Sequence, residues 1–255
     1  MLDLEEGYSV RLRKFFRPPG RKISGVHVTN NAGWLATKNG TEVFQATFEI
    51  RIAGRLPSLP PALHPTNPPT FIAQVWSCPE SPWGPFGLAQ ARVGCRSGLR
   101  PRGFVQGCVC NNEEAADALR RRWGFPARFG SVTLRRQYDA STVLVKVENQ
   151  TVCDLVAKDP EPLGNNDVSY TTAATLAHTP KGLRLVQVDI DVAAARAERV
   201  TPRLREFNGA LWGLHPSVDP YHPVSASIAV GSLTIQRLRY VSKPDELAFS
   251  GTETV

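Results

Sequence analysis

Three clusters of arginine residues are the sequence feature with the clearest capacity for chemistry. They lie at Arg96 to Arg102, at Arg120 to Arg122 and at Arg135 to Arg136. A guanidinium is planar and permanently charged, and its fork of donors fits a carboxylate or a phosphate. The chain has 23 arginines, 7 lysines and a net charge of +7. An acidic small molecule and a nucleic acid are therefore both candidate partners.

The sequence favours the acidic small molecule over the nucleic acid. A nucleic-acid surface interleaves aromatic side chains with basic ones, and the arginine segments contain few aromatic residues. A solvated helix end or strand face explains Arg121, Arg135 and Arg136 better than a binding role does. The sequence also lacks a Walker motif and a dinucleotide-binding glycine motif, so we expect no nucleotide cofactor.

The cysteines form no recognisable metal or nucleophile motif. Cys108 and Cys110 are two residues apart, which places both thiols on one side of a strand. No second pair of Cys or His residues stands at the spacing that zinc sites use. Cys95 and Cys153 lack the neighbours of a catalytic cysteine, and buried inert cysteine is the commoner state. We therefore expect no metal site, and reduced thiols rather than disulfides.

Short runs of alternating apolar and polar residues predict a chain dominated by antiparallel strands. The clearest run is Phe44 to Ile52, and similar runs are 71–76, 132–138, 142–148, 183–192 and 232–241. A helix is predicted from Asn112 to Trp123, because an asparagine precedes two glutamates, three arginines occupy the last turn and Gly124 follows. A second, weaker helical segment is predicted at Ala193 to Arg199.

Length and composition predict a single domain over residues 1–255. With 42% hydrophobic residues, a chain of this length can bury one large core. No run of 18 apolar residues occurs, so we expect no membrane-spanning helix. The first residues are acidic, whereas a secretory or mitochondrial presequence would be basic. These features predict a cytoplasmic protein.

One part of the chain resembles the acetoacetate decarboxylase superfamily. Residues 111–115 (NNEEA), Arg120 and residues 123–130 (WGFPARFG) match, without a gap, the family's Asp-Asn-x-x-Ala, its helical arginine and its Trp-Gly-Phe-Pro-Lys-Lys. Upstream, residues 84–88 (GPFGL) are similar to the family's Gly-Pro-Tyr-x-Glu. The resemblance covers roughly residues 70–150.

The resemblance implies a mainly β (α+β) fold: an antiparallel cone-like β-barrel with a few short helices, acetoacetate decarboxylase-like, assembled as a homo-oligomer. In the family, the first lysine of Pro-Lys-Lys forms a Schiff base with a keto acid. Burial or a neighbouring cation lowers the pKa of that lysine, so that a neutral amine is available. A glutamate of the Gly-Pro-Tyr-x-Glu segment assists with substrate and protons.

This chain departs from the family at each of these reactive positions. Ala127 stands at the Schiff-base lysine, Arg128 at the second lysine and Leu88 at the glutamate. Alanine cannot form an imine, and a guanidinium remains protonated near neutral pH. Lys146 alternates with valines along its predicted strand, and we expect it to point to water.

The remaining residues predict a site for an acidic or enolisable small molecule. The residues expected to bind the substrate are Trp83, Phe86, Leu88, Phe125 and Ala127. Arg128 and Arg96 are expected to be the catalytic cations that stabilise developing negative charge. We therefore predict an enzyme without a Schiff base, a lyase, cyclase or isomerase acting on a keto-acid or polyketide-like metabolite of secondary metabolism.

Two simpler explanations of the same residues remain open. Core packing alone would account for Leu88 and Phe125, and a structural ion pair would account for Arg128. The chain would then be a catalytically inactive ligand-binding or scaffold protein on the same fold.

The absence of a family lysine at Ala127 gives a direct chemical prediction. Incubation with acetoacetate or pyruvate and a hydride reductant should leave the mass of the protein unchanged, because no imine forms at this position. Intact-mass spectrometry followed by peptide mapping measures this. A reduced adduct localised to Lys146 would contradict the prediction, whereas adducts scattered over surface lysines would not.

Overall fold

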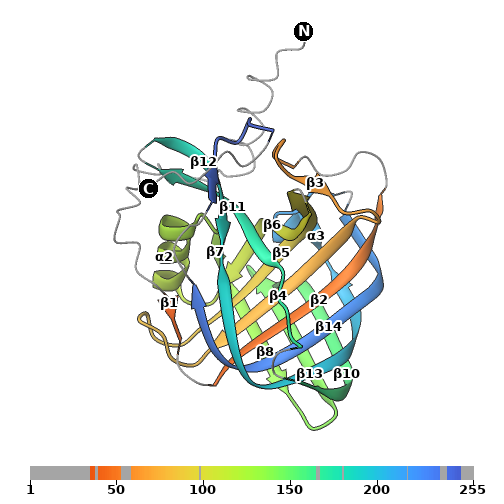
Figure 1. Cartoon of the computed structure of the whole chain (residues 1–255). Helices are drawn as coiled ribbons and strands as arrows, with labels where there is room; N and C mark the ends of the chain where they lie inside the picture. The colour runs from red at the N-terminus through yellow and green to blue at the C-terminus, as the bar shows by residue number, and fades with distance from the viewer. Residues whose placement is uncertain are drawn as a thin grey trace.

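The computed structural model describes residues 35–37, 40–52, 59–97, 99–164, 167–179, 181–216, 218–235 and 240–247. In these ranges the chain forms fifteen strands and two helices (Figure 1). In chain order they are β1 (Leu35–Ala36), β2 (Thr41–Ile52), β3 (His64–Pro65), β4 (Thr70–Cys78), β5 (Phe86–Ser97), β6 (Arg100–Cys110), α2 (Glu113–Trp123), β7 (Ala127–Phe129), β8 (Ser131–Arg136), β9 (Ala140–Val147), β10 (Gln150–Leu163), β11 (Thr172–Thr179), β12 (Gly182–Val188), β13 (Ile190–Phe207), α3 (Gly209–Trp212), β14 (Val218–Ile235) and β15 (Tyr240–Ser242).

The strands form one large, curved, mixed sheet. Their hydrogen-bonded order is β15-β12-β11-β6-β5-β4-β2-β14-β13-β10-β9-β8, with β1, β3 and β7 paired to β14, β5 and β6. Neighbours are antiparallel except at β6, which pairs in parallel with β11 and β7. The mainly β prediction is therefore confirmed. Antiparallel pairing dominates as predicted, although the sheet is mixed, and the pairing of the described strands does not close it into the expected cone-like barrel.

The predicted helix at Asn112 to Trp123 is confirmed as α2. The Asn112 side chain accepts a hydrogen bond from the Ala115 amide, and Gly124 ends the helix in the left-handed conformation at φ 69°. The predicted helix at Ala193 to Arg199 is wrong, since these residues lie in β13. There β13 pairs with β14 and, towards its second half, with β10. Pairing on both sides overrides the helical preference of the alanines.

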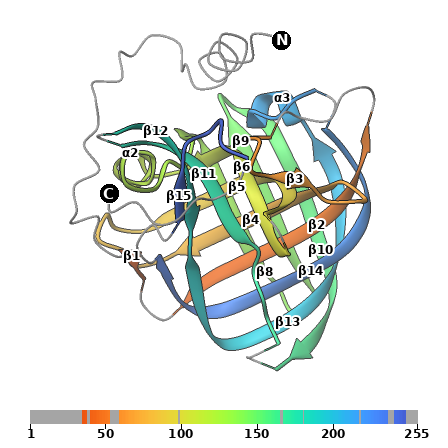
Figure 2. The same ribbon diagram turned by 45° about the horizontal axis from the view of Figure 1, so that its top comes forward.

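The central strands β2, β4, β5 and β6 are buried on both faces, so the sheet separates two hydrophobic cores. The first core includes Phe44, Phe71, Ala89 and Val109, with residues of β8, β9, β10, β13 and β14. The second core covers the opposite face and includes Trp76, Leu88 and Cys108, with residues of α2, β11 and β12. Figure 2 shows α2, β11 and β12 together beside β5 and β6, away from β10 and β13. Side chains that alternate along a central strand therefore enter different cores.

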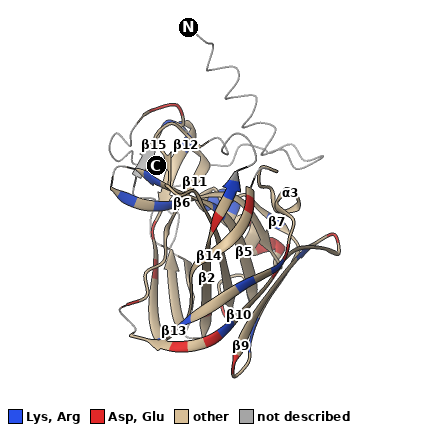
Figure 3. Ribbon diagram, turned by 90° about the vertical axis from the view of Figure 1, so that its right-hand side faces the viewer, with Lys and Arg blue, Asp and Glu red and all other residues tan. Residues whose placement is uncertain are grey.

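The arginine clusters of the sequence lie on separate elements. Arg96 and Arg102 belong to β5 and β6, whereas Arg121 belongs to α2 and Arg136 to β8. Figure 3 shows basic and acidic residues dispersed over several strands. Arg121 pairs with Asp117 at 2.8 Å, and Arg136 pairs with Glu198 at 2.6 Å. Ion pairing and surface solvation account for these two arginines.

Neither helix in the described ranges has the length and apolar composition that spanning a bilayer requires.

Trp123 joins the end of α2 to the second core, and its truncation should destabilise the fold. Its side chain is buried, its ring centroid lies 6.4 Å from that of Trp83, and its carbonyl accepts a 2.6 Å hydrogen bond from Thr175. Trp123→Ala should lower the free energy of unfolding by about 3–5 kcal/mol, measured by urea denaturation. Tyr138→Ala, at a fully exposed aromatic residue, is the control and should change it by less than about 0.5 kcal/mol. Equal effects would contradict this role.

Candidate functional site

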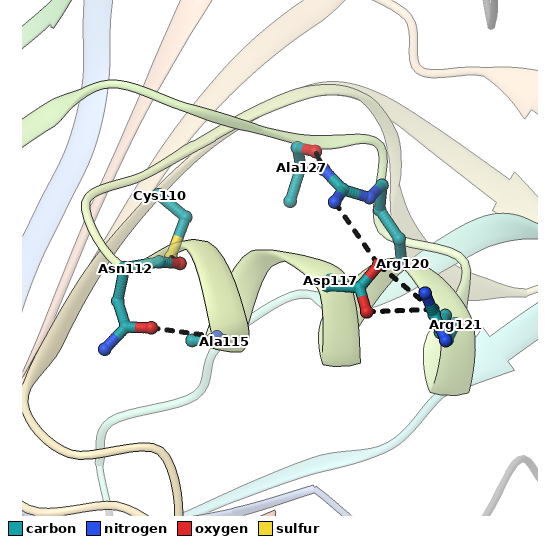
Figure 4. Close-up of polar contacts among 7 residues, drawn as sticks. All are labelled: Cys110, Asn112, Ala115, Asp117, Arg120, Arg121 and Ala127. Carbon is teal, nitrogen blue, oxygen red and sulfur yellow. Dashed lines mark hydrogen bonds and ion pairs between the residues drawn. The ribbon is translucent and has the colours of Figure 1, made fainter. Parts of the chain in front are cut away.

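Two asparagines tie the turn before β5 to the start of α2. The Asn111 side chain accepts a hydrogen bond from the Gly87 amide at 2.6 Å. The Asn112 side-chain nitrogen donates to the carbonyl of Trp83 at 2.9 Å, while its oxygen caps the helix (Figure 4). The asparagine pair therefore has a structural role here, because it fixes the relative positions of two segments that carry predicted site residues.

Arg120 fixes the strand that carries Ala127. Its guanidinium donates to the carbonyl of Ala127, seven residues along the chain, and lies 3.5 Å from Asp117 (Figure 4). Gly124 turns the chain back at this point, and an added Cβ there would lie 2.5 Å from the Leu176 carbonyl. These contacts hold β7 parallel to β6, with Ala127 opposite Cys108.

The predicted substrate-binding residues share one face of the sheet. Phe86, Leu88, Phe125 and Ala127 are buried in the second core, and Trp83 packs against it. The Phe125 ring meets the Trp76 ring edge-on at 6.0 Å, and Trp83 meets Phe86 in the same way at 6.1 Å. The structure thus brings together all five residues, with Trp76 as a sixth.

The two predicted catalytic arginines do not join this group. Along β7, Arg128 lies opposite Val109 of the first core, so it and Ala127 occupy opposite faces of the strand. Arg128 is half-buried, and desolvation lowers the pKa of its guanidinium while Glu148 raises it. Arg96 is exposed near the end of β5, eight residues from Leu88. Strand alternation separates Arg128 from the predicted site, and distance along β5 separates Arg96.

A row of polar side chains that sequence reasoning missed crosses the same face as Ala127. Gln45 of β2 is paired with Gln74 of β4, and Gln74 with Gln90 of β5. Gln90 is paired with Cys108 of β6, and Cys108 with Ala127. Residues directly opposite in register have their Cβ atoms about 5 Å apart. Ala127 is therefore the end of a row that contains three buried amides.

Arg92 supplies a fully buried cation beside this row. It follows Gln90 by two residues on β5, so both side chains enter the same side of the sheet. Its Nε donates to Gln90 Oε1 at 3.1 Å, and its Nη2 donates to Gln90 Oε1 at 2.6 Å and to Gln74 Oε1 at 2.5 Å. Its Nη1 donates to the carbonyl of Thr171 at 2.7 Å. Every polar contact of Arg92 within the described ranges is thus to an uncharged oxygen.

The Arg92 guanidinium remains charged in this surrounding. Burial lowers its pKa to about 10, and the nearby Cys108 acts weakly in the opposite direction. A pKa near 10 leaves the group protonated at neutral pH. Burial raises the pKa of the Cys108 thiol far above neutrality, although Arg92 opposes this shift. The site at neutral pH therefore combines a positive charge, neutral amides and a neutral thiol.

The segment before β11 lies against the same group. The Thr171 carbonyl accepts from Arg92, and the Thr171 amide donates to Gln45 Oε1 at 3.2 Å. The Tyr170 hydroxyl donates to the carbonyl of Val43 at 2.8 Å. This segment therefore links β2 to Arg92 across the face of the sheet.

Leu88, which the resemblance aligns with the family glutamate, is fully buried, and no group of three His, Cys, Asp or Glu side chains in the described ranges is placed to hold a metal ion.

Several solved structures are similar to this chain over most of their length. The acetoacetate decarboxylase of Legionella pneumophila matches with a TM-score of 0.68 and 18% identity, covering 89% of this chain and 93% of that one. The enduracididine biosynthesis enzyme MppR complexed with pyruvate matches with a TM-score of 0.59 and 17% identity, covering 79% and 87%. An acetoacetate decarboxylase-like enzyme of Sphingomonas wittichii matches with a TM-score of 0.59 and 13% identity, covering 84% and 98%. No family model and no curated protein matches the chain.

Lysines introduced at adjacent positions of β7 test which face of the strand carries the site. Ala127→Lys should place an amine beside the row that contains Cys108 and Gln90, where burial and the positive charge of Arg92 lower its pKa. Acetoacetate and borohydride should then give one reduced adduct at this lysine, detected by peptide mass spectrometry. Arg128→Lys, on the opposite face, should give none. Trapping at residue 128 but not at 127 would contradict the assignment.

Proposed function

We propose that this chain, which has the fold of acetoacetate decarboxylase and related enzymes, acts on an anionic small molecule with an enolisable carbonyl group, without forming an imine. The substrate class is a keto-acid or polyketide-like metabolite, and the reaction is that of a lyase, cyclase or isomerase. The observation that carries the proposal is the fully buried guanidinium of Arg92, whose polar contacts in the described ranges are all uncharged.

A buried, uncompensated positive charge favours a ligand that brings negative charge with it. Two unit charges about 7 Å apart interact by roughly 2 kcal/mol at an effective dielectric constant near 20. This attraction is available to a carboxylate in the ground state and to an enolate in the transition state. Catalysis requires that the site stabilise the enolate of the transition state more than the carboxylate of the ground state.

Loss of carbon dioxide from a 3-oxo acid illustrates a reaction that fits these groups. The pair of electrons of the breaking C–C bond moves towards the carbonyl oxygen, which becomes an enolate oxygen, and solvent later protonates the carbon. The step needs stabilisation of the enolate but neither an amine nor a protein base. Ala127, Leu88 and the neutral thiol of Cys108 are compatible with it.

The similar structures support a small oxo acid as the class of ligand. MppR was solved with pyruvate and with the condensation product of pyruvate and imidazole 4-carboxaldehyde. Closure of the sheet into a cone-like barrel, assembly as a homo-oligomer and a cytoplasmic location are further parts of this proposal, and they rest on the family resemblance and on the sequence.

The second candidate is a ligand-binding protein without catalysis. The observation that favours it is the replacement of both reactive family groups by Ala127 and Leu88. Benzoylacetate separates the two functions, because a decarboxylating enzyme converts it to acetophenone faster than buffer does. Binding without acceleration of this or any other enolate reaction would favour the second candidate.

Removal of the Arg92 charge tests the proposed function. The stable oxo acid 4-oxo-4-phenylbutanoate serves as the probe, and its affinity is measured by titration calorimetry. Arg92→Met should weaken binding at least about tenfold, which corresponds to about 1.4 kcal/mol. Arg92→Lys should restore part of the affinity, because it keeps the charge but loses the fork of donors.

Arg203→Met is the matched control, since Arg203 is exposed on β13 and its loss changes the net charge by the same amount. It should leave the affinity unchanged. Equal affinities of the wild-type protein and Arg92→Met would contradict the proposal, provided that circular dichroism shows both proteins folded.

A further inference from the structure

The donors of Arg92 fix the orientation of the amides around it. A guanidinium donates hydrogen bonds and accepts none, so the oxygen atoms of Gln74 and Gln90 must face it. The nitrogen atoms of both amides are therefore turned away from Arg92. The donor-only chemistry of the guanidinium therefore assigns which end of each amide is oxygen and which is nitrogen.

The two amide nitrogens differ in the hydrogen bonds that they donate. Gln74 Nε2 donates to Gln45 Oε1 at 3.0 Å, which is an ordinary hydrogen bond. Gln90 Nε2 reaches an acceptor only at 3.5 Å, the oxygen of Gln74, which already accepts from Arg92 and from the Trp76 ring nitrogen. The Gln90 side chain is 0% exposed. One buried amide nitrogen with two hydrogens is thus left with a single weak contact.

Buried donors of this kind normally have a partner. Gln90 lies opposite Cys108, and Cys108 lies opposite Ala127, the position of the lysine that reacts with a carbonyl group in the resembled family. The thiol of Cys108 is a weak acceptor, and Ala127 has no polar side chain. Within the described ranges the hydrogen bond that Gln90 Nε2 donates is the long one to Gln74 Oε1, and a ligand carbonyl group beside Ala127 would supply a better acceptor.

We infer that Gln90 is a specificity-determining residue whose amide nitrogen donates a hydrogen bond to the carbonyl oxygen of the ligand, with Arg92 holding the amide in the donating orientation. Arg92 then has two effects: its charge attracts the anion, and its hydrogen bonds turn Gln90. The site should select an anion that carries a carbonyl group over the same anion without one. This inference rests on the proposed function and names the part of the ligand that the site recognises.

A pair of stable acids separates recognition of the carbonyl group from recognition of the charge. 4-Oxo-4-phenylbutanoate and 4-phenylbutanoate have the same charge and carbon skeleton and differ by one carbonyl oxygen. The wild-type protein should bind the oxo acid at least about tenfold more tightly, since a site built to donate a hydrogen bond rejects an analogue without the acceptor.

Gln90→Glu and Gln74→Glu are matched variants for this measurement. Each places a carboxylate against Arg92 and neutralises its charge, so both should weaken the binding of both acids. Only Gln90→Glu removes the amide nitrogen that donates to the carbonyl oxygen of the ligand, so it should abolish the preference for the oxo acid. Gln74→Glu should retain that preference.

The outcomes distinguish a failure of the role of Gln90 from a failure of the proposed function. Equal affinity of the wild-type protein for the two acids, or a preference that survives in Gln90→Glu, would overturn the role of Gln90 and leave the proposed function intact. A failure of the wild-type protein to bind either acid would overturn the proposed function and, with it, this inference. Loss of the preference in both variants would assign recognition to the charge of Arg92 and would also overturn the role of Gln90.

Discussion

Arg92 is fully buried on the face of the central sheet that carries Gln74 and Gln90, against the segment before β11, and desolvation of its charge opposes folding. Four hydrogen bonds to neutral oxygens offset part of this cost. They explain why the amides of Gln74 and Gln90 are buried in the central strands β4 and β5, and why Thr171 lies against the sheet. A buried charge that lacks a counter-charge is strongly destabilising. An uncompensated cation is consistent with a site that awaits an anion.

The residues that carry the family resemblance divide into those that build the scaffold and those that would react. Asn111, Asn112 and Arg120 hold the turn before β5, the helix α2 and the strand β7 together through hydrogen bonds to backbone groups. These contacts do not depend on the reaction. The scaffold can therefore keep its motif while Ala127 replaces the amine, and the chemistry must then come from other side chains on the same face.

The local elements could be predicted from the sequence because their signals are local. The cap at Asn112, the charged turns of α2 and the stop at Gly124 are all within one segment, and the helix agrees with them. The helix prediction for Ala193 to Arg199 was wrong because these residues pair with two strands that are distant in sequence, and local propensity contains no information about such pairing. For the same reason, the sequence could not show that β6 pairs in parallel with β11.

The candidate site was partly predictable, and the features that the sequence did not reveal have separate physical causes. Phe86, Leu88, Phe125 and Ala127 follow from the motif and lie in one core. Gln45 was missed because alternation of polar and apolar residues predicts a strand with one face in water, whereas β2 has a second core on that face. Arg128 was misplaced because neighbours in a strand point to opposite sides. The alternation of Leu88, Gln90 and Arg92 was the available signal, since it places two polar groups on the face of a predicted site residue.

The unfolding free energy of Gln90→Glu in the absence of ligand tests the central claim most directly. If the Arg92 charge is uncompensated, the new carboxylate supplies its counter-charge, and urea denaturation at pH 7 should show a protein more stable than the wild type by about 1 kcal/mol or more. Pairing with Arg92 should hold the pKa of this carboxylate below its unfolded value. The gain should therefore be present above about pH 4.3 and disappear as the pH falls through the lower, folded pKa. A variant that is less stable than the wild type at pH 7 would contradict the account, because the attraction of the carboxylate to Arg92 would then be smaller than the cost of burying the carboxylate.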